Sequence, residues 1–107
     1  METRFMRLLL FFDLPVLTAK QRRAYGKFRK VLIDSGYIMK QESVYSKLAI
    51  NRQSVELELN KLKLNKPKEG LVQVLVVTEK QFASIVTLVG DNKDQGKLET
   101  TDRLIII

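Results

Sequence analysis

Residues 5–15 read Phe-Met-Arg-Leu-Leu-Leu-Phe-Phe-Asp-Leu-Pro, and this stretch decides the fold. The apolar residues in 5–12 follow one another without alternation, which is typical of a strand that is covered on both faces. Pro15 lacks an amide hydrogen and biases Leu14 away from helix, so the strand is expected to end beside Asp13. The sequence therefore predicts a central strand that ends in a carboxylate.

An amphipathic helix is predicted over residues 18–35, directly after that strand. Thr18 and Gln21 have the spacing of a capping box, and Gly36 suits the position that closes a helix. At 100° per residue, one arc of about 120° carries the side chains expected to face a core, namely Ala24, Tyr25, Phe28, Val31 and Leu32. The opposite side is cationic, with Lys20, Arg23, Lys27 and Lys30 at its centre and Arg22 and Arg29 at its flanks.

The next segments continue the alternation of strands and helices. Residues 37–48 are rich in strand formers and predict two short strands or one kinked ribbon. Asn51 is a suitable N-cap for a second helix, and residues 71–77 predict another strand of nearly continuous apolar character. The core stripe of the second helix is Val55, Leu59 and Leu62, whereas Leu57 and Leu64 lie on its far side.

The C-terminal part of the chain predicts a β-rich extension. Thr78 and Gln81 again have capping-box spacing, which indicates one short helical turn. Its apolar neighbours Phe82, Ile85 and Val86 are expected to face inward, and residues 86–89 to return to strand.

The order of elements is β-α-β-β-α-β, which is the ferredoxin-like arrangement of the α+β class. In this arrangement a four-stranded antiparallel sheet carries both helices on one face. We expect a single domain over residues 1–107, with its core in about 5–78 and the extension in about 79–107.

This arrangement leaves one face of the sheet uncovered, although its first and last core strands are apolar on both faces. A monomer would expose a large apolar patch there. Packing of two sheets in a two-fold homodimer, with the C-terminal extension paired to the partner, removes both the patch and the free strand edge. The alternative is a monomer that covers its own sheet with the tail.

The composition of the 107-residue chain limits its chemistry. There is no cysteine and no histidine, which excludes disulfides, thiol nucleophiles and imidazole catalysis. The apolar run at 8–12 is too short to span a membrane, and no small cleavage-site residues follow it. We therefore expect a cytoplasmic protein with no membrane contact.

The net charge of +7 is unevenly distributed. Residues 1–53 hold eleven Lys and Arg against four acids, whereas residues 54–107 hold eight of each sign. Such a surface suits a polyanion, because each phosphate that a cation neutralises releases condensed counterions. Ordinary solubilising charge is the alternative for net charge alone.

The predicted basic helix gives a stronger signal, because a solvated helix face normally mixes both signs of charge. Its apolar side is needed for the sheet and is unavailable to a lipid surface or a partner helix, so binding to a nucleic-acid backbone is favoured. Lys47 and Arg52 lie near the start of the second helix and are expected to extend the track. No motif for reading bases is present, so shape and charge should decide binding.

Asp13 is the strongest candidate for a functional acid. Two copies across a two-fold axis could share one Mg²⁺ or Mn²⁺ through carboxylate oxygens and activate water against a phosphodiester. The alternative is that Asp13 only caps the turn before Pro15. No second acid lies close to it in the sequence, which weakens the interpretation as an enzyme.

Several of these stretches together resemble the second CRISPR-associated protein, a small family that works in spacer acquisition, and most closely its type II forms. The resemblance is carried, in order, by Phe12-Asp13-Leu14-Pro15, the basic segment 20–30, residues 36–48, residues 77–82 and Asp102-Arg103-Leu104-Ile105.

The resemblance implies a homodimer that lies between two integrase dimers, and the integrase is the first CRISPR-associated protein. The homodimer is expected to hold duplex DNA, including duplexes with single-stranded ends. It assigns phosphate contacts to Lys20, Arg22, Arg23, Lys27 and Lys47, and it assigns Asp13 to a metal that underlies an endonuclease activity on RNA or DNA. It also implies that the C-terminal strand docks the integrase. The residues of that strand are Arg103, Leu104, Ile105, Ile106 and Ile107.

Overall fold

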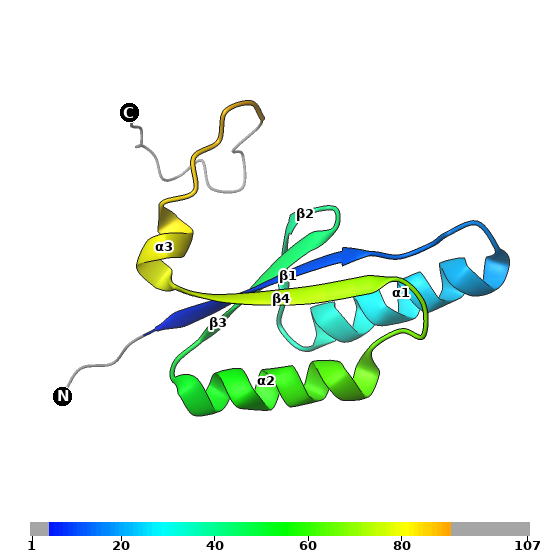
Figure 1. Ribbon diagram of the computed structural model, residues 1–107, viewed down its shortest axis with the longest axis horizontal. Coiled ribbons are helices and arrows are strands. Elements are labelled where there is room, and N and C mark those ends of the chain that lie inside the picture. Colours follow the sequence, from blue (N-terminus) through cyan, green and yellow to red (C-terminus); the bar gives the residue numbers. More distant parts are fainter. Residues whose placement is uncertain (1–4, 91–107) are drawn as a thin grey trace.

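The computed structural model describes residues 5–90 (Figure 1). The element order is β1 (Met6–Asp13), α1 (Ala19–Asp34), β2 (Ile38–Gln41), β3 (Val44–Ala49), α2 (Arg52–Asn65), β4 (Leu71–Thr78) and α3 (Glu79–Ala83). The four strands form one antiparallel sheet in the order β2-β3-β1-β4. This confirms the predicted ferredoxin-like arrangement, with β2 and β3 as two strands rather than one ribbon.

Strand β1 lies inside the sheet, with β3 on one side of it and β4 on the other. Leu10 stands opposite Tyr45 of β3 and Val74 of β4. Leu8 and Leu10 are fully buried, because alternate residues of β1 point toward the face that α1 and α2 cover (Figure 1).

The main core forms where both helices meet this face of the sheet. Phe28 and Leu32 of α1 and Leu62 of α2 pack into one cluster with Phe12 of β1 and Tyr45 of β3. The Phe12 ring meets the Phe28 ring edge-on at a centroid distance of 5.6 Å. Ala24 was expected on the core side of α1 but is exposed, because it lies toward the edge of the apolar arc and its methyl group is short.

The helix ends follow the sequence signals. The Thr18 hydroxyl accepts from the Gln21 amide at 3.0 Å, and the Gln21 side chain accepts from the Thr18 amide at 3.0 Å. Asn51 Oδ1 accepts from the Ser54 amide at 2.8 Å at the start of α2. Gly36 follows the end of α1 with a φ of 94°, a left-handed conformation that glycine adopts without strain.

The second face of the sheet has no helix layer over it within the described residues. Of the described helices, only α3 approaches this face, at the end of the sheet where β1 begins. Arg7 binds the Glu79 carboxylate through two nitrogens, and its guanidinium lies 4.4 Å from the centre of the Phe82 ring. Apolar side chains stay exposed elsewhere on this face, and they include Phe11, Leu48, Leu71 and Leu75.

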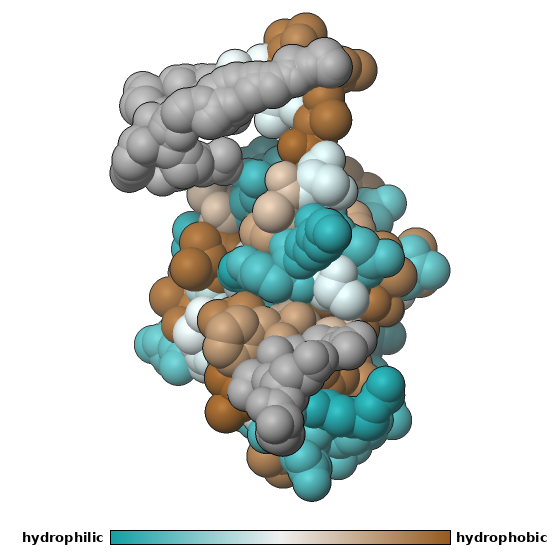
Figure 2. Space-filling view, turned by 90° about the vertical axis from the view of Figure 1, so that its left-hand side faces the viewer, coloured by the Kyte–Doolittle hydropathy of each residue, from teal (hydrophilic) through white to brown (hydrophobic). Residues whose placement is uncertain are grey.

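The segment after α3 differs from the prediction. Residues 86–89 are not a strand, and Ile85 and Val86 are exposed rather than turned inward. Among residues 5–90, this segment pairs with neither edge strand of the sheet, β2 or β4, and a strand needs such a partner for its backbone hydrogen bonds. Figure 2 shows the resulting apolar surface at the top of the molecule, where Leu88 is 89% and Val89 is 93% exposed.

Candidate nucleic-acid interface

The outer side of α1 is the most one-sided charged surface of any described element. The helix holds six Lys and Arg and one acid, Asp34, and all seven side chains are exposed. Lys30 pairs with Asp34 at 3.1 Å, with both groups largely in solvent. Within residues 5–90, Lys20, Arg23 and Lys27 form no ion pair. These three therefore present uncompensated positive charge to the solvent.

Arg22 has a different surrounding from the other cations of α1. Its guanidinium turns back and donates to the carbonyl oxygens of Val16 at 3.2 Å and Leu17 at 3.0 Å. The side chain thus fixes the loop between β1 and α1. Its charge stays at the start of the helix, close to Lys20 and Arg23.

Lys47 lies on the helix-covered side of β3 rather than on the basic side of α1. Its Nζ is 2.7 Å from Glu58 Oε2 of α2 and 2.6 Å from the carbonyl oxygen of Ser35 at the end of α1. The Lys47 and Glu58 side chains are 24% and 12% exposed. The positive charge of Lys47 is therefore balanced inside the fold, and it joins β3 to both helices.

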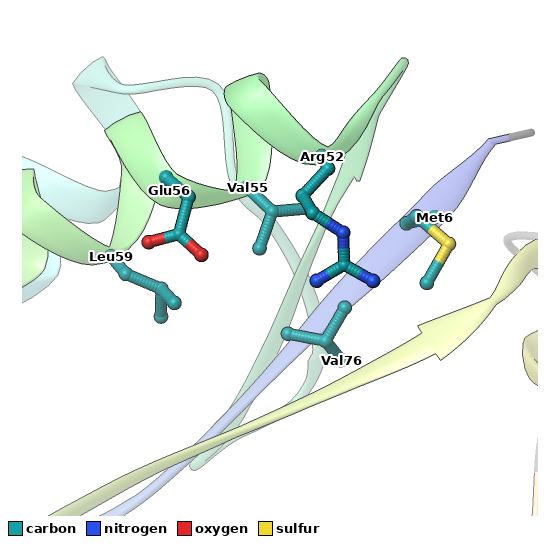
Figure 3. Close-up of a pocket in the computed structure, with 6 residues that line it drawn as sticks. All are labelled: Met6, Arg52, Val55, Glu56, Leu59 and Val76. Carbon is teal, nitrogen blue, oxygen red and sulfur yellow. The ribbon is translucent and has the colours of Figure 1, made fainter.

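Arg52 lies at the first turn of α2, beside the start of β1. It lines a hollow of about 450 Å³ together with Glu56 (Figure 3). The other lining residues are apolar, and they are Met6, Val55, Leu59 and Val76. Lys20 follows the opposite end of β1, so the structure does not bring Arg52 together with the first turns of α1 (Figure 1).

Asp13 ends β1 opposite Leu71 of β4, and its side chain is exposed. The adjoining backbone is tightly packed. A Cβ added at Gly70 would lie 2.8 Å from the Asp13 carbonyl oxygen. In the part of the chain that the structure describes, no three carboxylate, histidine or cysteine side chains come together as metal ligands. One copy of the chain therefore offers a divalent cation a single carboxylate, that of Asp13. The site fits such a cation only if a second copy supplies further ligands.

Comparison with known proteins identifies the family of this chain. The family model described as CRISPR associated protein Cas2 matches residues 6–85. The chain belongs to the Cas2 family. This confirms the resemblance to that family, whereas the roles expected of Asp13 and the basic residues stay predictions. A protein of Treponema denticola is 48% identical over 102 residues, which are 95% of this chain and all of the relative.

Two further Cas2 relatives are also more than 40% identical to this chain. One from Streptococcus mutans serotype c is 45% identical and shares 95% of this chain and 93% of its own. Another from Acidovorax ebreus is 49% identical over 79% of this chain and 83% of its own. All three relatives bear the name CRISPR-associated endoribonuclease Cas2.

The Cas2 fold brings to the basic surface two lysines that the sequence alone did not single out. Lys66 and Lys68 are exposed in the turn between α2 and β4. The Gln21 amide nitrogen donates to Glu69 Oε1 at 3.1 Å, which ties this turn to the start of α1. The signal was available in the sequence, because a strand antiparallel to β1 must begin where β1 ends. We call Lys20, Arg22, Arg23, Lys66 and Lys68 the basic end.

The expected docking segment for the integrase, residues 103–107, lies outside the described residues of this Cas2 chain. Within residues 5–90, no helix combines the length and the apolar character that crossing a membrane requires.

Proposed function

We propose that this Cas2 chain is the central dimer of a CRISPR spacer-acquisition complex. It binds duplex DNA through the basic side of α1 without reading its sequence, and it bridges two integrase dimers. The observation that carries this proposal is the uncompensated charge of Lys20, Arg23 and Lys27 on an exposed helix of a Cas2 protein. Phosphates are the ligands that such a surface favours, because their counterions are released on binding.

The test of DNA binding is its dependence on salt. Fluorescence anisotropy of a labelled duplex, measured over a series of salt concentrations, gives the slope of log K against log salt. Replacing Lys20 and Arg23 by alanine should weaken binding and reduce the slope by about one for each phosphate that the variant no longer neutralises. Lys80→Ala is a matched control, because Lys80 is exposed on α3 at the other end of β1. An equal slope in the wild type and the α1 variant would contradict the proposal.

The open sheet face supports the dimer. Leu71 and Leu75 of β4 are 55% and 52% exposed, and Phe11 of β1 and Leu48 of β3 add further apolar area to the same face. Packing this face against a second copy removes it from water. It also doubles the number of basic helices that one duplex can meet.

Leu75→Lys tests this face, because the side chain is half exposed in one copy and the change leaves the helix-covered core intact. Sedimentation equilibrium should give a dimer for the wild type and a folded monomer for the variant. Leu64→Lys is the control, since Leu64 is exposed on the outer side of α2. A variant at Leu75 that stays dimeric would show that another surface joins the copies.

A second function, cleavage of RNA or DNA with Mg²⁺ or Mn²⁺, is favoured by the endoribonuclease name of the relatives and by the exposed Asp13 carboxylate. In a two-fold dimer, two Asp13 side chains would supply the metal ligands that one copy lacks. Asp13→Asn keeps the shape and removes the charge. Cleavage of a labelled RNA by the wild type that the variant loses would support this function, and equal cleavage by both would exclude Asp13.

A further inference from the structure

The loop that leads into the basic helix exposes two apolar side chains. Leu17 is 86% exposed and Val16 is 46% exposed, although the residues on both sides of the loop are packed or hydrogen-bonded. A single exposed leucine needs no explanation in general. Here, however, the exposed pair stands at the start of the most cationic element of the described chain.

The backbone of this loop is held firmly in place. The Leu17 amide donates to Gln21 Oε1 at 2.8 Å, and the Leu17 carbonyl oxygen accepts from Arg22 at 3.0 Å. The Val16 carbonyl oxygen accepts from the same Arg22 nitrogen at 3.2 Å. Both backbone polar groups of Leu17 are therefore satisfied within the fold. A ligand that contacts Leu17 meets a loop that is already ordered, so binding loses little conformational entropy.

The chemistry around the loop decides which ligand fits. Lys20 follows Leu17 by three residues, and the bond between Gln21 and Glu69 holds the turn with Lys66 and Lys68 at the same end. Asp13 and Glu69 lie at this end too, but the five cations of the basic end outnumber these two acids. An apolar tip beside an excess of positive charge does not suit a cationic or an apolar protein surface. It suits a polyanion that offers a narrow groove between two rows of charge.

We infer that Leu17, with Val16 beside it, rests in the minor groove of the DNA duplex that the basic end holds. This inference rests on the proposed function. The minor groove of B-DNA is about 6 Å wide and has phosphates along both edges. Proteins that bind this groove with basic side chains frequently insert apolar side chains, leucine among them, between neighbouring base steps. The contact contributes affinity that does not depend on released counterions, and it favours DNA over RNA, whose minor groove is wide and shallow.

Leu17→Ser tests this contact in the full-length protein. Anisotropy with a DNA duplex should show binding weaker by roughly five- to tenfold, as expected when part of a leucine side chain is no longer buried, while the salt slope stays that of the wild type. Leu17→Met should keep most of the affinity. Leu57→Ser is the control, because Leu57 is 65% exposed in the half of α2 that lies away from Lys66 and Lys68.

The outcomes separate the inference from the proposed function. If the Lys20 and Arg23 variants lower the slope but Leu17→Ser binds like the wild type, the minor-groove contact is wrong and the function stands. If neither the lysine and arginine changes nor Leu17→Ser affects binding, the proposed DNA-binding function is itself wrong. If Leu17→Ser binds DNA normally but no longer retains a protein partner that the wild type retains, the loop is a protein contact and the inference is overturned. The circular dichroism of the variants verifies that each is folded.

Discussion

Lys47 Nζ of β3 lies 2.7 Å from Glu58 Oε2 of α2, and this ion pair is mostly shielded from solvent. The other Glu58 oxygen accepts from the Tyr37 hydroxyl at 3.3 Å. Lys47 also donates to the Ser35 carbonyl oxygen, at the end of α1. A residue expected from the family resemblance to hold a phosphate thus also connects three elements of its own fold.

Lys47→Met should therefore destabilise the protein. Removing the charged hydrogen bond costs about 2 kcal/mol of the free energy of unfolding, because Glu58 keeps only the Tyr37 hydroxyl and the more distant Lys61 ammonium, at 3.9 Å. Urea unfolding at one fixed protein concentration measures this, with Lys27→Met as the exposed control, expected within about 0.5 kcal/mol of the wild type. A stable Lys47→Met that binds DNA more weakly with a lower salt slope would instead support a direct phosphate contact.

Tyr45→Phe should stabilise the protein. Tyr45 is fully buried, and its hydroxyl has no hydrogen-bond partner among the described residues. Phenylalanine keeps the ring, which stacks on Phe12 at 5.6 Å, and removes an unsatisfied polar atom. The expected gain is about 1 kcal/mol in the free energy of unfolding. A decrease of similar size in urea unfolding would mean that the hydroxyl has a partner after all.

Gly70→Ala should destabilise the junction between β4 and the end of β1. Gly70 has a φ of 96°, and an added Cβ would lie 2.7 Å from Leu14 Cδ2. The strained backbone and the close contact together cost about 2 kcal/mol of unfolding free energy. Gly26→Ala is the matched control: nothing lies within 4 Å of its added Cβ, so it should stabilise α1 by roughly 0.5–1 kcal/mol. Destabilisation of equal size by both changes would contradict this account.

Stability should fall at high pH through Tyr37. Burial, followed by the negative charge of Glu58 and the hydrogen bond to it, raises the pKa of the Tyr37 hydroxyl above its ordinary value of 10.0. The folded state therefore keeps the proton longer than the unfolded state does. The stabilisation is fully present below pH 10 and is lost as the pH rises above it.

Unfolding of the wild type and of Tyr37→Phe at pH 9 and at pH 11 measures this effect. The free energy of unfolding should decrease more between the two pH values for the wild type than for the variant. An equal decrease in both proteins would show that Tyr37 is not the source of the alkaline destabilisation.

Local sequence signals determined the elements of this protein. The helix ends are marked by capping residues, because a cap acts over one turn of backbone. Helix α1 begins after Thr18, whose hydroxyl binds the Gln21 amide, and it ends before Gly36. Helix α2 begins after Asn51. The unbroken apolar run of β1 identified the strand at the centre of the core. The charge of α1 was also readable, since a helix that packs one face must turn the other to solvent.

Tertiary structure alone decided which cations act together. Lys47 and Arg52 are close to each other in the sequence, but they lie in different surroundings. Lys47 forms an ion pair with Glu58 on the helix-covered side of the sheet, whereas Arg52 lies beside the start of β1, at the opposite end of that strand from Lys20. The antiparallel pairing of β4 with β1 brings Lys66 and Lys68 to the start of α1 instead. Residues 86–89 have the composition of a strand but pair with no strand among the described residues. Composition describes each residue's preference, whereas charge pairing and strand formation depend on neighbours that only the folded chain supplies.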